Sequence, residues 1–210
     1  MSASRSALLV VDVQNDFLPG GALAVPAGDA VIEPVKRLLS EGRWKAVVFT
    51  QDWHPADHVS FASNHAGRAP FEDIELPYGT QKLWPVHCVA GSRGAALPET
   101  LADTRANVVI RKGTNPEVDS YSAFVEADGR AVTGLAGYLK ALDIDEVVVC
   151  GLALDFCVRF TAEDAVAAGF KTTVAEDATA AIVPADNDAL FARLAGIGIR
   201  RRQVAEIVAD

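Results

Sequence analysis

The sequence has few cysteines, no long apolar run and a shortage of positive charge, and each excludes a class of protein. Only three of the 210 residues are cysteine, an odd, small number that is typical of free thiols in a reducing compartment. No apolar run approaches the roughly 20 residues that a membrane span needs. Lysine and arginine total 19 against 28 acidic residues, so we expect no broad basic face for nucleic acid.

Low-complexity tracts, internal repeats and linker-like segments are also missing. Met1–Ser6 is short and polar, without the charged segment and apolar run of a secretory signal, so we expect a cytoplasmic protein. Apolar residues make up 50% of the chain and charged residues 22%, which is ordinary globular composition. This length and composition predict one α/β domain over residues 1–210, and they leave open whether it forms a homo-oligomer.

What the sequence does contain is a series of short apolar runs rich in valine and isoleucine. Continuous runs, rather than alternation, favour strands that are buried on both faces of a parallel sheet. Five runs are clear and the last is weaker: Ala7–Val11, Ala46–Thr50, Asn107–Ile110, Glu146–Cys150, Lys171–Ala175 and Gln203–Val208.

Helical patterns lie between these runs. We expect Asp29 to cap a helix that ends near Gly42, and Asp155 to cap another that stops at Gly169. Leucines at helical spacing mark two more, over 135–142 and 190–194. The alternation predicts a single doubly wound α/β domain, with a mostly parallel sheet of about six strands flanked by helices. The stretch Gln51–Leu101 does not fit, and a loop of that length is usually functional.

Polar residues follow four of the predicted strands directly. Asp12 follows the first, Asp52 and then His54 follow the second, Lys112 follows the third, and Cys157 lies just beyond the fourth. Ligands of open α/β sheets bind outside the carboxyl ends of the strands, so these side chains are expected on one edge. An aspartate after a strand is more often a turn or cap residue, and it is the convergence of four positions that favours a site.

Cys157 is the best candidate for a nucleophile. A position in the first turn of a helix favours the thiolate, and Asp12 and Lys112 would supply a base and a positive charge if their strands are neighbours. The alternative is a buried small apolar residue, which is the usual fate of a free cysteine. We expect that alternative for Cys150 and Cys88.

The segment after Asp52 is rich in histidine. Asp52 and His54 are two residues apart, so on an extended stretch both point to the same side. His87, and also His58, could complete a set of ligands, and imidazole with carboxylate suits zinc, iron or manganese. The alternative is that these are ordinary loop histidines, which we expect for His65.

Five segments closely resemble nicotinamidases, which are metal-containing amidases of the isochorismatase-like hydrolase superfamily. The segments occur in the family's order and span nearly the whole chain: VVDVQNDFLPGG (Val10–Gly21), TQDWHPADHVSF (Thr50–Phe61), LWPVHCVAGSRG (Leu83–Gly94), RKGTNPEVDSYSAF (Arg111–Phe124) and GLALDFCVRFTAEDA (Gly151–Ala165).

The resemblance implies a catalytic role for each of three residues. Asp12 matches the base, Lys112 the catalytic lysine and Cys157 the nucleophile. Leu152–Ala153 matches the position of a cis peptide in the family, and the N–H groups of Ala153 and Cys157 match its oxyanion hole.

The resemblance also implies a cofactor and a substrate pocket. Asp52, His54 and His87 match the ligands of one divalent metal ion, zinc before iron or manganese, in a metal-site loop region around residues 51–101. His58 matches a position that ligates metal in some members only. Four further residues match positions that line the aromatic substrate pocket: Phe17, Leu23, Trp84 and Tyr121. Without the resemblance, these four would be read as ordinary packing.

The implied reaction is hydrolysis of nicotinamide to nicotinate and ammonia, with pyrazinamide as a second substrate. One rival is a sister amidase acting on N-carbamoylsarcosine or a ureido compound, and the set of metal ligands favours the nicotinamide branch over it. The other rival is a non-catalytic binding protein on the same fold, against which the intact Asp12, Lys112 and Cys157 speak. No nucleic acid or membrane partner is expected.

Overall fold

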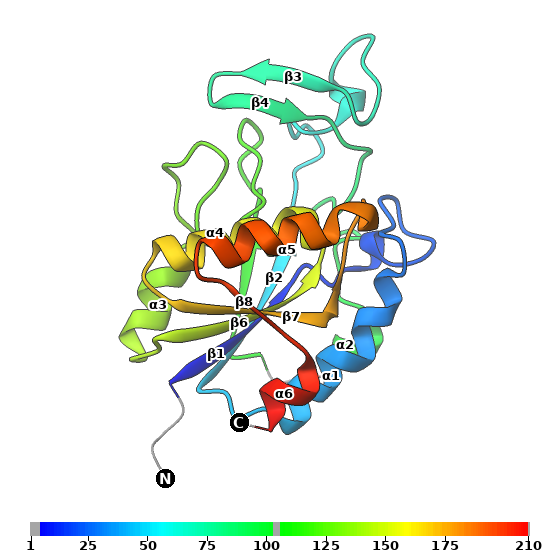
Figure 1. The fold of residues 1–210 in the computed structure, drawn as a ribbon. Coiled ribbons are helices and arrows are strands. Elements are labelled where there is room, and N and C mark those ends of the chain that lie inside the picture. Colours follow the sequence, from blue (N-terminus) through cyan, green and yellow to red (C-terminus); the bar gives the residue numbers. More distant parts are fainter. Residues whose placement is uncertain (1–4, 103–105, 210) are drawn as a thin grey trace.

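The computed structural model describes residues 5–102 and 106–209. Its central sheet has six parallel strands in the order β5-β2-β1-β6-β7-β8 (Figure 1). The chain starts near the middle with β1, builds outward to one side and then to the other, which is the doubly wound arrangement. The strands are β1 (Ser6–Val11), β2 (Ala46–Asp52), β5 (Val108–Lys112), β6 (Glu146–Leu152), β7 (Lys171–Ala180) and β8 (Arg200–Arg202).

Five of the six predicted strands are confirmed, and the sixth is wrong. The edge strand is β8, whereas the predicted run Gln203–Val208 contains the helix α6 (Val204–Val208). The backbone N–H of Gln203 donates to the Glu206 carboxylate in a capping box, which starts a helix. Val204 and Ile207 are then one helical turn apart and both are buried, so the apolar residues follow a helical period.

Helices cover both faces of the sheet. The helices α1 (Ile32–Glu41), α2 (Glu99–Ala102) and α6 contribute to one apolar cluster. The helices α3 (Leu135–Ala141), α4 (Arg159–Ala167) and α5 (Asn187–Gly196) contribute to the other. Successive residues of β1 alternate between the two clusters, Leu8 in one and Leu9 in the other. Burial on both faces therefore explains the continuous apolar run of β1, whereas in the edge strand β5 burial alternates and Val109 is exposed.

The four predicted helices are present, but the predicted cap at Asp29 is wrong. Asp29 lies inside a 3₁₀ turn, Gly28–Val31, which leads into α1, and the residue at the N-cap is Val31. The carbonyl of Asp29 accepts the Ile32 N–H. Such i+3 bonds satisfy the backbone groups that a capping side chain would otherwise bind.

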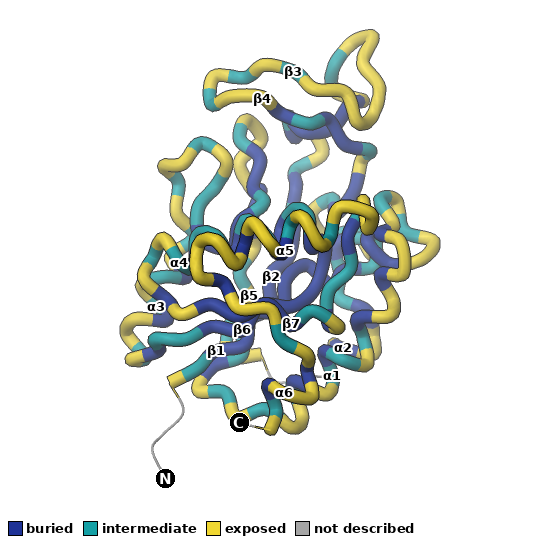
Figure 2. Tube along the Cα trace, in the orientation of Figure 1, coloured by how far each residue is buried: buried dark blue, intermediate teal, exposed yellow. Residues whose placement is uncertain are grey.

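The segment that follows β2 contains more regular structure than the sequence predicts. It holds an antiparallel hairpin made of β3 (Asp73–Leu76) and β4 (Gly79–Lys82). The hairpin stands away from the central sheet (Figure 1), and its strands are largely exposed or half-buried, whereas the inner strands of the sheet are buried (Figure 2). Among the described residues, no helix combines the length and apolarity needed to cross a bilayer.

Candidate active site and metal centre

The predicted catalytic residues come together at the carboxyl ends of the strands, next to β1, where the order of the strands reverses. Asp12 follows β1, Lys112 ends β5, and Cys157 lies beyond the end of β6. The strands β1 and β6 are neighbours, and β2 lies between β1 and β5. Asp12 has a left-handed backbone, with φ of 47°, so the chain turns sharply as it leaves the strand. Its N–H then donates to Thr50 Oγ1, and Thr50 Oγ1 donates to Asp12 Oδ1 at 2.6 Å.

Lys112 is the centre of this group. Its side chain is fully buried, its Nζ lies 2.8 Å from Asp12 Oδ2, and it also contacts Asp52 Oδ1. The same ammonium donates to the Ser120 carbonyl at 2.9 Å and lies 3.5 Å from Cys157 Sγ. One buried cation therefore touches the predicted base, the predicted nucleophile and a predicted metal ligand.

The charges explain how the group titrates. Burial lowers the pKa of Lys112, but Asp12 and Asp52 outweigh it and hold that pKa well above its usual value. Burial also raises the pKa of Asp12, and Asp52 adds to this effect while Lys112 opposes it. A carboxylate with a raised pKa is a stronger base than an exposed one, which suits a group that must accept and return a proton.

The surroundings of Cys157 differ from the sequence prediction in two ways. It lies in a π-helical turn, Leu154–Val158, ahead of α4. Asp155 does not cap this turn, because its carboxylate accepts the backbone N–H groups of Ile182 and Val183 at 3.0 and 2.9 Å. Burial raises the pKa of the Cys157 thiol well above its usual value, although Lys112 lowers it. The resting group is therefore a thiol, and a base has to remove its proton.

The predicted metal ligands also converge. Asp52, His54 and His87 are buried, and each offers an atom within 4.8 Å of the others. Asp52 Oδ2 lies 3.8 Å from His54 Nε2 and 3.9 Å from His87 Nε2. Burial opposes ionisation of Asp52, but Lys112 and the two histidines outweigh it and hold its pKa far below the usual range. Asp52 is thus anionic at neutral pH, which its predicted role as a metal ligand requires.

Backbone carbonyls fix the orientation of both imidazoles. Nδ1 of His54 lies 2.9 Å from the Gly113 carbonyl, and Nδ1 of His87 lies 2.8 Å from the Pro85 carbonyl. A carbonyl can only accept, so Nδ1 carries a proton in each ring, and Nε2 is the nitrogen that remains to bind a metal. Carbonyl partners of this kind are typical of histidines that bind metal. The donor set and its orientation therefore fit a divalent ion of the zinc, iron or manganese class.

Gly113 is a functional residue that the sequence reasoning missed. Its φ is +61°, and a Cβ at this position would run into the His54 ring. Only glycine lets the backbone approach the imidazole this closely. The signal was the glycine that immediately follows Lys112.

His58 is not in the group of Asp52, His54 and His87, but it forms a second possible metal-binding group with His54 and Asp119, whereas His65 is in neither group. His58 Nε2 donates to the Val118 carbonyl at 3.2 Å, and its Nδ1 lies 2.7 Å from Ser60 Oγ. Burial and the nearby His54 lower the pKa of His58 to about 4, so the ring is neutral and both nitrogens are engaged. His65 Nε2 donates to the Val59 carbonyl at 2.7 Å in the loop.

A small cavity joins the nucleophile to the metal ligands. Its free volume is about 30 Å³, which is close to the share of one water molecule. All four predicted substrate-binding residues line it, and so do Asp119, Phe156 and Ile182, which were not in the predicted set. Ala153 and Cys157 line it as well, and the Leu152–Ala153 peptide is cis as expected. The roles of these residues toward a substrate stay predictions.

Comparisons with known proteins agree with this geometry. Residues 6–206 match the model of the Isochorismatase domain family, and the chain therefore belongs to that family. The chain is 52% identical to a nicotinamidase of Acinetobacter baylyi over 180 residues, which cover 86% of this chain and 83% of that protein.

Solved structures show the same relationship. A nicotinamidase and pyrazinamidase of Acinetobacter baumanii superposes with a TM-score of 0.93 at 48% identity, over 99% of this chain and 100% of that one. A pyrazinamidase of Pyrococcus horikoshii in complex with zinc superposes with a TM-score of 0.73 at 35% identity, over 95% and 99% of the two chains. The parallel α/β fold predicted from the sequence is thus confirmed.

Proposed function

We propose that this protein is a nicotinamidase, a cysteine amidohydrolase that converts nicotinamide to nicotinate and ammonia and also accepts pyrazinamide. The observation that carries the proposal is one cavity that holds both the thiol of Cys157 and the group of Asp52, His54 and His87. Trp84 and Tyr121 add aromatic walls to that cavity, which suits a flat ring. The names of the related proteins support the same substrate.

The first half of the reaction makes an acyl-enzyme. Asp12 takes the proton of Cys157, and Sγ attacks the amide carbon of the substrate, forming a C–S bond. The N–H groups of Ala153 and Cys157 bind the oxyanion. Asp12 returns the proton to the amide nitrogen, the C–N bond breaks, and ammonia leaves. Lys112 stabilises the anionic forms of Asp12 and Cys157 throughout, because its Nζ contacts both.

The second half releases the product. Asp12 accepts a proton from water, and the resulting hydroxide attacks the thioester carbon. The C–S bond then breaks, Asp12 returns its proton to Sγ of Cys157, and the product releases its own acid proton to solvent and leaves as nicotinate. The same carboxylate serves in both halves, and its position 2.8 Å from Lys112 Nζ supports that role.

Asp52, His54 and His87 would hold the metal ion, and we infer zinc as its identity. When bound, such an ion supplies a Lewis-acid anchor for a ring nitrogen. The zinc complex of the related pyrazinamidase supports this choice. Asp52 also contacts Lys112, so the metal centre and the catalytic group share one network of charges.

A comparison of three aromatic amides tests the function. Nicotinamide and pyrazinamide should both release ammonia, whereas benzamide, which has no ring nitrogen, should be a poor substrate. A site built around a polar contact rejects analogues that lack it by factors of about 10⁴–10⁵. Equal kcat/KM for benzamide and nicotinamide would refute the anchoring role and favour a sister amidase. Removal of the metal with a chelator should raise KM for nicotinamide steeply.

We also infer a reducing compartment such as the cytoplasm. The three cysteines, Cys88, Cys150 and Cys157, are all free and buried. A nucleophilic thiol needs to stay reduced to act, and cytosolic thiols are kept in that state. Fractionation of cells that make the untagged protein, followed by immunoblotting, checks this location.

A further inference from the structure

The β3–β4 hairpin has one buried residue in its strands. Seven of the eight strand residues are exposed or half-buried, and Gln81 is 2% exposed. The hairpin otherwise lies at the surface, apart from the central sheet (Figure 2). A buried polar residue on an exposed element calls for an account of its hydrogen bonds, because an unsatisfied buried amide is costly.

The amide of Gln81 is fully engaged, and two of its partners belong to the cavity. Its Nε2 donates to Asp119 Oδ2 at 2.6 Å and to the Lys82 carbonyl at 2.7 Å, and it lies 3.2 Å from the Tyr121 hydroxyl. Its Oε1 accepts the Tyr78 hydroxyl at 3.0 Å. Asp119 and Tyr121 both line the cavity that holds Cys157, so a side chain of the hairpin reaches the wall of the candidate active site.

The bonds of Gln81 extend to a second aromatic wall. The Tyr121 hydroxyl also accepts Trp84 Nε1–H at 3.1 Å, and Trp84 follows the hairpin closely in the chain. The Tyr121 and Trp84 rings lie edge to face, with centroids 6.4 Å apart. A change in the Gln81 amide would therefore be felt by both aromatic rings that are expected to contact the substrate.

Asp119 makes the donor of Gln81 important. Asp119 is 2% exposed, and its carboxylate also accepts the N–H of Ser120, which donates to Oδ1 at 2.8 Å. His54 and His58 each offer a ring nitrogen within 4.8 Å of this carboxylate. A buried carboxylate also depends on the N–H groups that reach it.

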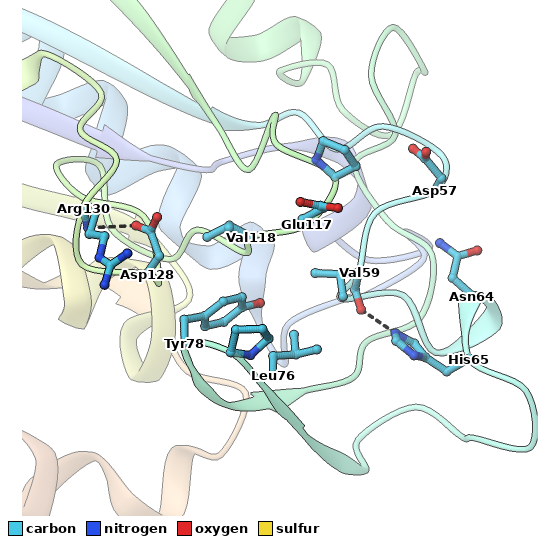
Figure 3. A pocket seen from close by; sticks show the side chains of 12 residues that line it. Asp57, Val59, Asn64, His65, Leu76, Tyr78, Glu117, Val118, Asp128 and Arg130 are labelled. Atoms are coloured by element: carbon cyan, nitrogen blue, oxygen red, sulfur yellow. Dashed lines mark hydrogen bonds between the residues drawn. The ribbon is translucent and has the colours of Figure 1, made fainter.

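The far side of this cluster faces a second hollow. A groove of about 740 Å³ runs between the hairpin, which carries Leu76 and Tyr78, and the loop that carries Glu117 and Val118 (Figure 3). Tyr78 lines the groove, and its hydroxyl accepts the Asp119 N–H at 3.3 Å while donating to Gln81. The cluster of Tyr78, Gln81 and Asp119 is thus a thin partition between the groove and the catalytic cavity.

We propose that Gln81 is a positioning residue of the substrate pocket, whose amide holds the Asp119 carboxylate and the Tyr121 hydroxyl in the places that substrate binding needs. This inference rests on the proposed function, because the pocket is taken to bind nicotinamide. It makes the hairpin a part of the active site, although no strand residue of the hairpin lines the cavity. The alternative is a purely structural role, in which Gln81 only anchors the hairpin to the rest of the protein.

The test compares two substitutions of Gln81 with one neighbouring control. Gln81→Leu keeps the size and removes the donor, so KM for nicotinamide should rise about ten- to a hundredfold, the scale of a lost buried hydrogen bond to a charged group. The value of kcat should change much less. Thr80→Ala alters an exposed residue of the same strand, whose hydroxyl donates only to Glu75 at 2.9 Å, and should leave both constants unchanged.

Gln81→Glu separates positioning from anchoring through its pH dependence. At high pH the new carboxylate and that of Asp119 are both negatively charged and repel each other, so the variant should bind substrate poorly. At low pH the pair shares a proton, and an O–H replaces the lost N–H donor. The KM of this variant relative to wild type should therefore fall as pH decreases, with thermal melting used to confirm that every variant is folded.

The outcomes distinguish this inference from the proposed function. Wild-type protein that releases no ammonia from nicotinamide contradicts the proposed function. Active wild type with an unchanged KM in Gln81→Leu contradicts the positioning role, as does a KM ratio for Gln81→Glu that does not vary with pH. A lower melting temperature without a change in KM would leave Gln81 as an anchor only, and would also overturn the inference.

Discussion

The two halves of the candidate site are held in different ways. Asp12 and Lys112 lie at the ends of β1 and β5, which the parallel ladder joins through β2, and Cys157 lies in the turn that follows β6, the other neighbour of β1. His87 and Trp84 lie in the segment between β2 and β5. Its described residues form no ladder with the central sheet, and isolated bridges such as Phe61 to Trp84 join parts of the segment to each other. The second half depends instead on individual bonds between side chains and backbone carbonyls. The comparison teaches that single substitutions should disrupt chemistry in the first half and geometry in the second.

The largest effect is expected at the end of the sheet. Cys157→Ala should abolish ammonia release while the protein stays folded and keeps its metal, because the change removes Sγ and little else. Cys150→Ala is the matched control, because it removes a different buried thiol, which lies within β6, and the variant should keep most of the activity. Measurable turnover by Cys157→Ala would contradict its assignment as the nucleophile.

Lys112→Met should come next. It removes the cation that contacts Asp12, Asp52 and Cys157 and leaves two buried carboxylates close together. Lys112 lowers the pKa of the thiol, so its loss should raise that pKa further. The rate of alkylation by iodoacetamide against pH should shift to higher pH, and an unchanged curve would mean that Lys112 does not influence Cys157.

Substitutions in the segment between β2 and β5 should act on activity through the loss of bound metal. His54→Ala and His87→Ala should each lose bound metal by elemental analysis, and with it activity on nicotinamide. His65→Gln provides the control, because its ring bonds only to the Val59 carbonyl in the loop and the variant should keep a full complement of metal. Stoichiometric metal in either alanine variant would remove that histidine from the ligand set.

Gly113→Ala should have the smallest effect among these predictions. Gly113 directly follows Lys112 and its carbonyl contacts His54, so this residue connects the two halves of the site. The new methyl group would push the His54 ring away from the Gly113 carbonyl, so metal affinity should fall about 10–100-fold, as for other outer partners of metal ligands. Titration with zinc under a competing chelator measures it. An affinity equal to wild type would show that the ring finds another support.

The sequence predicts the sheet half of the site well because one physical pattern controls it. A strand buried on both faces is a continuous apolar run, so the first polar residue after it, such as Asp12, marks the edge where ligands bind. The metal ligands needed more than the pattern, since Asp52 and His54 share a strand end but His87 is far away in the chain. The residues alone left His87 and His58 as alternatives for the third ligand, and the resemblance to known amidases favoured His87.

The residues that were assigned wrongly or not identified from the sequence depend on contacts with residues that are distant in the chain. Asp155 fits the local rule for a helix cap, yet its carboxylate binds N–H groups that lie beyond β7. Asp119 and Gln81 carry no local signal, since the hairpin strands have four residues each and their burial arises only when the hairpin meets the loop after Lys112. Tertiary contact, and not propensity, decides the structure at such positions.

Gly151 shows how a residue can be irreplaceable without touching a substrate. Its φ is +110°, and a Cβ there would collide with the backbone of Val11, one residue before Asp12. In a survey of all single substitutions selected for growth on nicotinamide, position 151 should be as depleted of variants as position 157. A survey that records only intolerance to substitution would then not distinguish this point of close packing between β1 and β6 from the nucleophile.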